Sequence, residues 1–324
     1  MHQRHSSGVK MFEGIYRLSN KVFGIKAVAI ALSSLFIAST IPLLVEAHMP
    51  GAKPPPKFEL EPIVINDGGR KIEITTIDGI GDYHNERAKD MKRQMLKKQG
   101  KTDEEINAIM EEEFAGADGK YPCTSCAFRA ALLGISKIWG NEIPKRDDIK
   151  IISNLSTPGS CQCFQYITGI GSKIEPSPKT KGEFHIILPN GTEITNKSIK
   201  NLKKNGVNTN IDNWKFNISR KSTGEYFIVD VKDDVFPDDF FELRRKVKHG
   251  IPEAATEEEV DRFRSEWEEV RNAFLTKLDW ELFEGIEEPK EDVTSGIIFL
   301  FNPWSMYCSW CYYMAYQKKE AIDR

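Results

Sequence analysis

The sequence predicts an α+β domain over residues 63–284, with helices packed around a mixed or antiparallel β-sheet. Three observations support this class. Apolar residues recur at helical spacing before about residue 170, and an alternating period marks two hairpins after it. A long amphipathic helical pattern then returns near the end of the domain. At 324 residues, 40% of them hydrophobic, the chain can bury a sizeable core.

The elements expected in chain order begin with a hairpin over residues 63–77 that turns at Asp67-Gly68-Gly69. Residues 83–114 predict two helices broken at Gly100, the second capped by Thr102 or Asp103. The later expected elements are a helix at 126–139, a strand at 148–154, a short helix at 164–168, hairpins at 183–188 with 192–195 and at 214–220 with 226–231, and helices at 236–247 and 257–278.

Four of the six cysteines lie close together in the sequence, between Tyr121 and Gly169. Cys123 and Cys126 form a Cys-x-x-Cys pair, and Cys161 and Cys163 form a Cys-x-Cys pair. Each pair is expected at the start of a helix, where unpaired backbone N–H groups and the helix dipole favour thiolate over thiol. We therefore expect the chemistry of the protein to lie here.

Three interpretations of the cysteine pairs are open. Four thiolates on two short loops could close a tetrahedral site around zinc or iron, and this is the leading interpretation. In an oxidising compartment the two loops could instead be joined by disulfides. A Cys-x-x-Cys pair that opens a helix is also typical of thiol–disulfide exchangers. Among the histidines, only His84, beside Asp82 and Glu86, has neighbours that resemble a site.

The sequence pattern of the N-terminal 47 residues predicts that the protein is exported. Four basic residues precede an uncharged apolar run over residues 27–45, and Val45-Glu46-Ala47 offers small residues to a signal peptidase. Residues 1–47 are therefore a signal peptide or, because the run could span a bilayer, an uncleaved anchor. A Pro-rich extended linker is expected over residues 48–62. The basic residues are Lys10, Arg17, Lys21 and Lys26.

Residues 296–316 form a second uncharged run, rich in aromatic residues and followed by Gln-Lys-Lys. This pattern favours a transmembrane segment, although Asn302-Pro303 within it leaves a buried hairpin or a docking tail as alternatives. Cys308 and Cys311 are then two apolar thiols within that segment. The domain between the two runs is expected to be extracytoplasmic, either periplasmic or at the cell surface, and anchored to the membrane.

The charge of the chain excludes one class of partner. The formal net charge is -3 and the isoelectric point about 6.2, with basic and acidic residues mixed along the chain. Nucleic-acid binding normally needs a basic patch or stripe, so no nucleic-acid partner is predicted.

The central region resembles the formylmethanofuran dehydrogenase E-type subunit family over roughly residues 115–235. The likeness lies in Cys123, followed by a helix carrying Phe128-Arg129-Ala130-Ala131-Leu132. It continues in the Asp-Ile-Lys-Ile strand that ends at Asn154, and in Gln165-Tyr166-Ile167-Thr168-Gly169. The resemblance implies an α+β domain with a zinc or iron site that often pairs as a homodimer.

The ligand motif departs from that family. The His-Gly-His-x-Cys motif of the family is replaced here by Asp118-Gly119-Lys120-Tyr121-Pro122-Cys123, so both histidines are gone. The second loop carries Ser160-Cys161-Gln162-Cys163 where the family has a single cysteine, and the C-terminal zinc ribbon of many members is missing. The resemblance therefore implies the fold and a metal-binding tendency, without the dehydrogenase reaction.

The sequence as a whole predicts an exported, membrane-associated, metal-binding accessory domain. The candidate ligands are the thiolates of Cys123, Cys126, Cys161 and Cys163, and the expected role is metal handling or support of a partner redox complex. The alternative is an extracytoplasmic redox enzyme that uses the same cysteines. A filled four-thiolate site leaves no open position for a substrate, which favours the binding role, whereas three ligands and a water would favour catalysis.

Overall fold

A five-stranded mixed sheet, in the order β5-β4-β3-β6-β7, forms the framework of the computed structural model. The strands are β3 (Ile149–Ser153), β4 (Glu183–Ile187), β5 (Glu193–Thr195), β6 (Lys215–Arg220) and β7 (Tyr226–Asp230). Strands β3 and β4 are parallel because the chain crosses over through a helix between them, and the other neighbouring pairs are antiparallel. The prediction of an α+β fold with a mixed sheet is confirmed.

The structure describes residues 49, 52–53, 55–56, 60–114, 119–188, 190–195 and 210–289. The expected signal or anchor (1–47) and the expected transmembrane segment (296–316) lie outside these residues. Within the described ranges, no helix is both long and apolar enough to cross a membrane.

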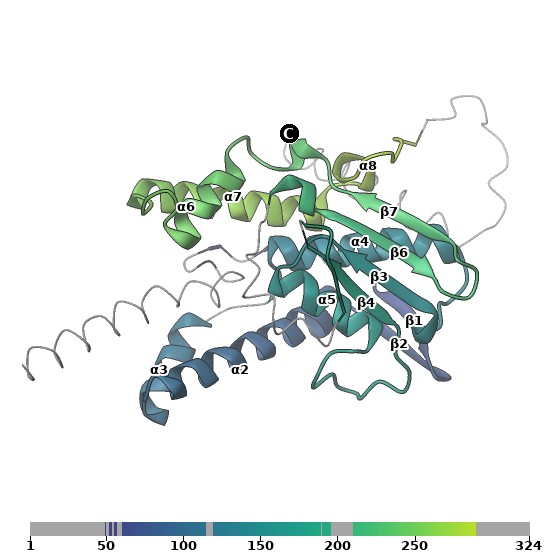
Figure 1. Ribbon diagram of the computed structural model, residues 1–324, viewed down its shortest axis with the longest axis horizontal. Helices are drawn as coiled ribbons and strands as arrows, with labels where there is room; N and C mark the ends of the chain where they lie inside the picture. The colour runs from purple at the N-terminus through teal and green to yellow at the C-terminus, as the bar shows by residue number, and fades with distance from the viewer. Residues whose placement is uncertain are drawn as a thin grey trace, which may run out of the picture. The chain divides into compact units, whose positions relative to one another are not determined.

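Helix α4 (Pro122–Trp139) packs on one face of the sheet, against β6 and β7 (Figure 1). Its other sides meet α5 (Pro158–Thr168) and α7 (Glu257–Thr276). Thirteen residues of α4 are buried, as expected for a helix enclosed on several sides. At Gly134 the helix approaches β6 so closely that an added Cβ would lie 2.8 Å from a side-chain carbon of Ile218. Only glycine fits there without a shift of Ile218.

Four further α-helices lie before α4 and after the sheet in the described part of the chain. Helices α2 (Asp82–Lys98) and α3 (Asp103–Glu113) are separated near Gly100, and Thr102 caps α3 in a capping box with Glu105, which confirms the predicted break and cap. Helices α6 (Phe240–His249) and α8 (Asp279–Leu282) follow the sheet. A cluster of aromatic rings joins the start of β6 to α6 and α7; its members are Trp214, Phe236, Phe240, Phe241, Phe263 and Phe274.

Two helices begin earlier than the sequence predicted. Helix α4 begins at Pro122 rather than Cys126, and α5 begins at Pro158 rather than Phe164. In both, a proline occupies the first turn, where its missing N–H costs nothing and its fixed φ suits the helix. The Thr157 hydroxyl also caps α5 by accepting a hydrogen bond from the Ser160 N–H. Both cysteine pairs therefore lie within helices rather than in the loops before them.

The described residues of the expected Pro-rich linker contact the domain. Met49 and Leu60 are buried in the main core. The Lys53 carbonyl accepts a hydrogen bond from the Arg271 guanidinium of α7 (2.8 Å), and the Lys53 N–H donates to Glu268. These contacts fix this part of the chain along α7.

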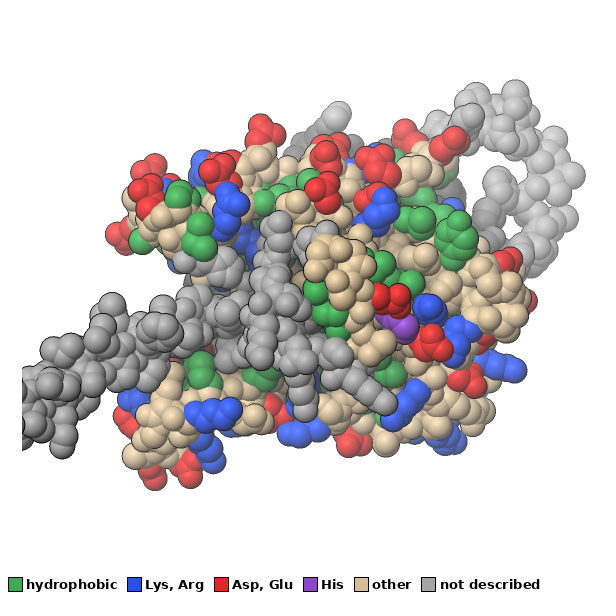
Figure 2. Space-filling model, in the orientation of Figure 1, with side chains coloured by type: hydrophobic (Ala, Val, Ile, Leu, Met, Phe, Trp, Pro, Cys, Tyr) green, Lys and Arg blue, Asp and Glu red, His purple; other side chains and the backbone are tan. Residues whose placement is uncertain are grey.

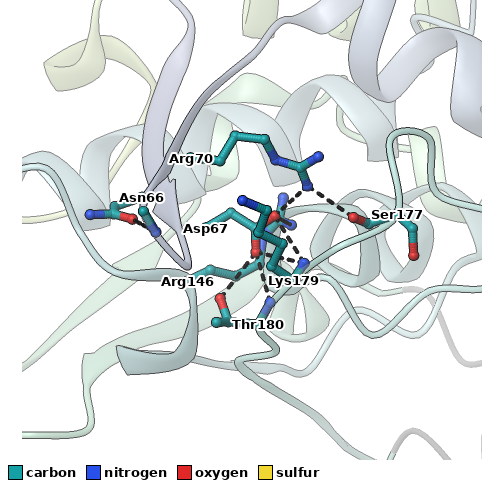
Figure 3. A network of polar contacts seen from close by, with 8 residues as sticks. Asn66, Asp67, Arg70, Arg146, Ser177, Lys179 and Thr180 are labelled. Atoms are coloured by element: carbon teal, nitrogen blue, oxygen red, sulfur yellow. Dashed lines mark hydrogen bonds and ion pairs between the residues drawn. The ribbon is translucent and has the colours of Figure 1, made fainter.

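The hairpin of β1 (Ile63–Asp67) and β2 (Arg70–Ile74) is held by a buried carboxylate at its turn (Figure 3). Asp67 is fully buried and accepts hydrogen bonds from Arg70 (2.6 Å), from the Lys179 N–H (3.0 Å) and from the Thr180 N–H (2.8 Å). Arg146, itself 1% exposed, adds an ion pair at 3.2 Å. A buried charge is tolerated only with such partners, and here they link three segments far apart in sequence.

These partners lower the pKa of the Asp67 carboxyl. Burial by itself would raise the pKa of the Asp67 carboxyl. The hydrogen bonds from Arg70, Lys179 and Thr180, together with the positive charge of Arg146, outweigh that effect and hold the pKa well below its usual range. Because the folded-state pKa is depressed, the stabilisation is present above the unfolded-state value of about 4 and is lost as the pH falls below it.

We expect Asp67→Asn to lower the free energy of unfolding at neutral pH by about 3 kcal/mol, because it leaves the buried Arg146 charge without its counter-charge. The variant should also lose the decline of stability that the wild type shows from about pH 4 downward. Urea unfolding at several pH values measures both effects. Glu73→Gln, an exposed change on the same hairpin, is the matched control. Equal unfolding midpoints for the Asp67 variant and the wild type would show that this network contributes nothing.

Candidate functional site

The first turns of α4 and α5 lie against each other, and this contact brings the two cysteine pairs into one neighbourhood. Gly159, in the first turn of α5, faces Thr124 of α4 so closely that an added Cβ would lie 2.6 Å from the Thr124 hydroxyl oxygen and 3.6 Å from the Cβ of Cys123. The structure therefore places together two motifs that are 35 residues or more apart in the sequence.

The four cysteines differ in exposure. Cys126, Cys161 and Cys163 are buried, whereas Cys123 is partly exposed, and no disulfide joins any two of the four. The disulfide that could join the two loops is therefore not formed in this structure.

Burial controls the protonation of the three inner thiols. Removal from water raises the pKa of the Cys161 thiol to about 12, although the neighbouring Ser160 hydroxyl acts in the opposite direction. Burial raises the pKa of Cys126 and of Cys163 well above the usual value for a thiol. The Cys123 and Cys163 side chains act in the same direction on the pKa of Cys126. The three inner cysteines are neutral thiols in the folded protein.

A small pocket opens beside Cys123, with a volume of about 20 Å³. Helices α4, α5, α6 and α7 and the residue before β6 all contribute to its wall. The lining residues are Tyr121, Pro122, Cys123, Thr157, Pro158, Gly159, Trp214, Phe240, Arg244 and Trp267. Among the described residues of this lining, Cys123 is the one that carries a sulfur, so the accessible thiol and the pocket form a single site.

Tyr121 joins the wall of the pocket to α2. Its ring packs edge-on against His84, with the ring centres 5.0 Å apart, and its hydroxyl donates a hydrogen bond to Asn85 (3.2 Å). The Nδ1 atom of His84 is hydrogen-bonded to the side chain of Gln162, between the two cysteines of α5. The buried His84 thus links Tyr121, in the wall of the pocket, to Gln162 of α5, and it does not line the pocket itself.

The structure does not provide a preformed site for the predicted metal ion among the residues that it describes. Among the residues that the structure describes, no group of three or more His, Cys, Asp or Glu side chains is arranged to hold a metal ion. The four thiols meet in one region, but three of them are buried and protonated. Metal binding would require them to lose their protons, which a bound cation can promote.

Several residues that line the pocket carry no signal of that role in the sequence. Trp214, Arg244 and Trp267 come from positions 91, 121 and 144 residues after Cys123, and each lies in a segment whose pattern predicted only an ordinary strand or helix. Their contribution to the site depends on how α6 and α7 pack against α4, which no local pattern encodes.

Comparison with known proteins adds no identification: no family model, no curated protein and no solved structure matches this chain. The resemblance to the formylmethanofuran dehydrogenase E-type subunit family stays a prediction from the motifs. The function must therefore be inferred from the site itself.

We expect Cys123 to be alkylated by iodoacetamide in the native protein at least about ten times faster than Cys126, Cys161 or Cys163, because thiolate is the reacting form and burial opposes it at the other three. Peptide mass spectrometry after timed labelling identifies each modified cysteine. Protein unfolded in urea is the control, in which all four should react at similar rates. Labelling of Cys161 or Cys163 as fast as Cys123 in the folded state would contradict this assignment.

Proposed function

We propose that this chain is a thiol–disulfide redox protein in which Cys123 is the reacting thiol and Cys126 the resolving thiol. The observation that carries the proposal is the contrast within the Cys-x-x-Cys pair. Cys123 is partly exposed and lines the pocket, while Cys126, one turn further along α4, is buried. The position of Cys123 in the first turn of an 18-residue helix favours its thiolate.

The reaction follows from the two environments. The Cys123 thiolate attacks one sulfur of a substrate disulfide, forming a mixed disulfide and releasing the other sulfur as a thiolate. Cys126 then attacks the Cys123 sulfur, passes its proton to the departing thiolate and closes the Cys123–Cys126 disulfide. Two electrons move from the pair to the substrate. Burial keeps Cys126 protonated until the mixed disulfide forms beside it, because it raises the pKa of that thiol.

Binding of zinc or iron by the four cysteines is the second candidate function. It is supported by the contact between the first turns of α4 and α5, where a Cβ added at Gly159 would lie 3.6 Å from the Cβ of Cys123. In this role the chain would be an accessory domain that handles metal or supports a redox complex, and a homodimer would fit the family resemblance.

The proposed location is outside the cytoplasm, with membrane attachment through the terminal segments. The support is the sequence pattern of residues 1–47 and 296–316 and their flanking charges. An oxidising compartment supplies disulfide substrates, so the proposed location and the proposed redox chemistry agree.

A pair of serine variants distinguishes the two candidate functions. If the redox proposal holds, Cys126→Ser should trap a mixed disulfide at Cys123, while Cys161→Ser should exchange disulfides at the wild-type rate. If the cysteines hold metal, both variants should lose it and become less stable, because metal-binding energy is also folding energy. Mass spectrometry of the trapped adduct, with elemental analysis of protein purified without added metal, distinguishes these outcomes. Turnover unaffected by Cys126→Ser would exclude the resolving role.

Carbonate extraction tests the attachment. We expect full-length protein with its signal cleaved to remain in the membrane pellet, because the apolar run over residues 296–316 is long enough to span the bilayer. A version truncated after Glu291 should be extracted, provided that its signal is also cleaved. If the full-length protein is released by carbonate, residues 296–316 are a docking element and not a membrane span.

A further inference from the structure

The lining of the pocket beside Cys123 includes two side chains that carry hydrogen-bond donors. Arg244 contributes a guanidinium although its residue is only 7% exposed. Trp214 contributes an indole ring that is 2% exposed, and its Nε1 has no hydrogen-bond partner among the described residues. A buried donor without a partner is costly, and the cost is removed if a ligand accepts its hydrogen bond.

Two helices begin at this pocket. Pro122, Thr157, Pro158 and Gly159 are all in the lining, so the N-terminal ends of both α4 and α5 face the same space. The first-turn N–H groups of a helix have no partners within the helix, and its dipole places partial positive charge there. Both effects favour a negative group.

A further buried polar atom lies where α4 and α5 contact each other. The Thr124 hydroxyl is buried without a partner in the described part of the chain, and it faces Gly159 across the α4–α5 junction. The described residues of the lining include no Asp or Glu, so no carboxylate among them repels an anion. At about 20 Å³, the pocket holds one small group rather than a whole ligand.

We propose that this pocket is an anion subsite that binds the carboxylate of a small acidic disulfide or thiol, and so presents the substrate sulfur to Cys123. Arg244 and the Trp214 indole N–H hold the carboxylate, and the two helix N-termini add their positive ends. The inference deepens the proposed redox role of Cys123 and rests on it.

A pair of alkylating reagents tests the subsite directly. Iodoacetate and iodoacetamide have nearly the same shape, and each forms an S–C bond with the thiolate and releases iodide, but only iodoacetate carries a carboxylate. We expect the iodoacetate-to-iodoacetamide rate ratio at Cys123 to fall about tenfold in Arg244→Gln, the size of one lost charge-assisted hydrogen bond. Arg245→Gln, at the exposed neighbouring position on α6, should keep the wild-type ratio.

A second measurement needs no variant and guards against loss of folding in Arg244→Gln. Propionate should protect Cys123 of the wild-type protein from iodoacetamide, whereas propionamide at the same concentration and ionic strength should not. If Cys123 reacts but the rate ratio is the same in all three proteins, or if propionate gives no protection, the anion subsite is wrong while the redox proposal stands. If Cys123 reacts with neither reagent, the proposed redox role itself is overturned.

Discussion

The close contact between α4 and β6 is the constraint on which the rest of the domain depends. Gly134 lets the helix lie directly on Ile218, and the buried face of α4 then meets the sheet while its other sides meet α5 and α7. Because packed interiors tolerate little change of volume, the position of this helix fixes the places of its neighbours. The N-terminal end of α4, with its Cys-x-x-Cys pair, is therefore held on a rigid element rather than on a loop.

Charge is arranged differently inside the domain and on its surface. In the interior, Asp67 is paired with Arg146, which links the β1–β2 hairpin to the segment before β3, and hydrogen bonds from the Lys179 and Thr180 N–H groups to Asp67 link the hairpin to the loop before β4. On the face shown in Figure 2, acidic and basic side chains are interspersed. Such mixed surface charge suits a solvated exterior, and exposed pairs of this kind contribute little stability.

The same burial that stabilises the domain divides the four cysteines by reactivity. Three thiols lie in the core, where loss of water keeps them protonated, and one remains at the surface of a pocket. Cys123 is the second residue of α4, whereas Cys126 and both cysteines of α5 lie further along their helices, where the helix dipole acts more weakly. Burial acts in the same sense, because it leaves Cys123 as the accessible sulfur.

Most of the helices and hairpins, and the cap of α3, could be predicted from the sequence, because they depend on periodicity and on a few local residues. The break at Gly100, the Thr102 cap and the turn at Asp67-Gly68-Gly69 are examples. Local pattern also located the candidate chemistry at the cysteine pairs, although it placed the starts of α4 and α5 too late. Local pattern did not predict that Cys123 is the accessible thiol or that Trp214 and Arg244 lie beside it; both follow from the three-dimensional packing. Exposure and proximity arise from the packing of distant segments, and no local pattern records that packing.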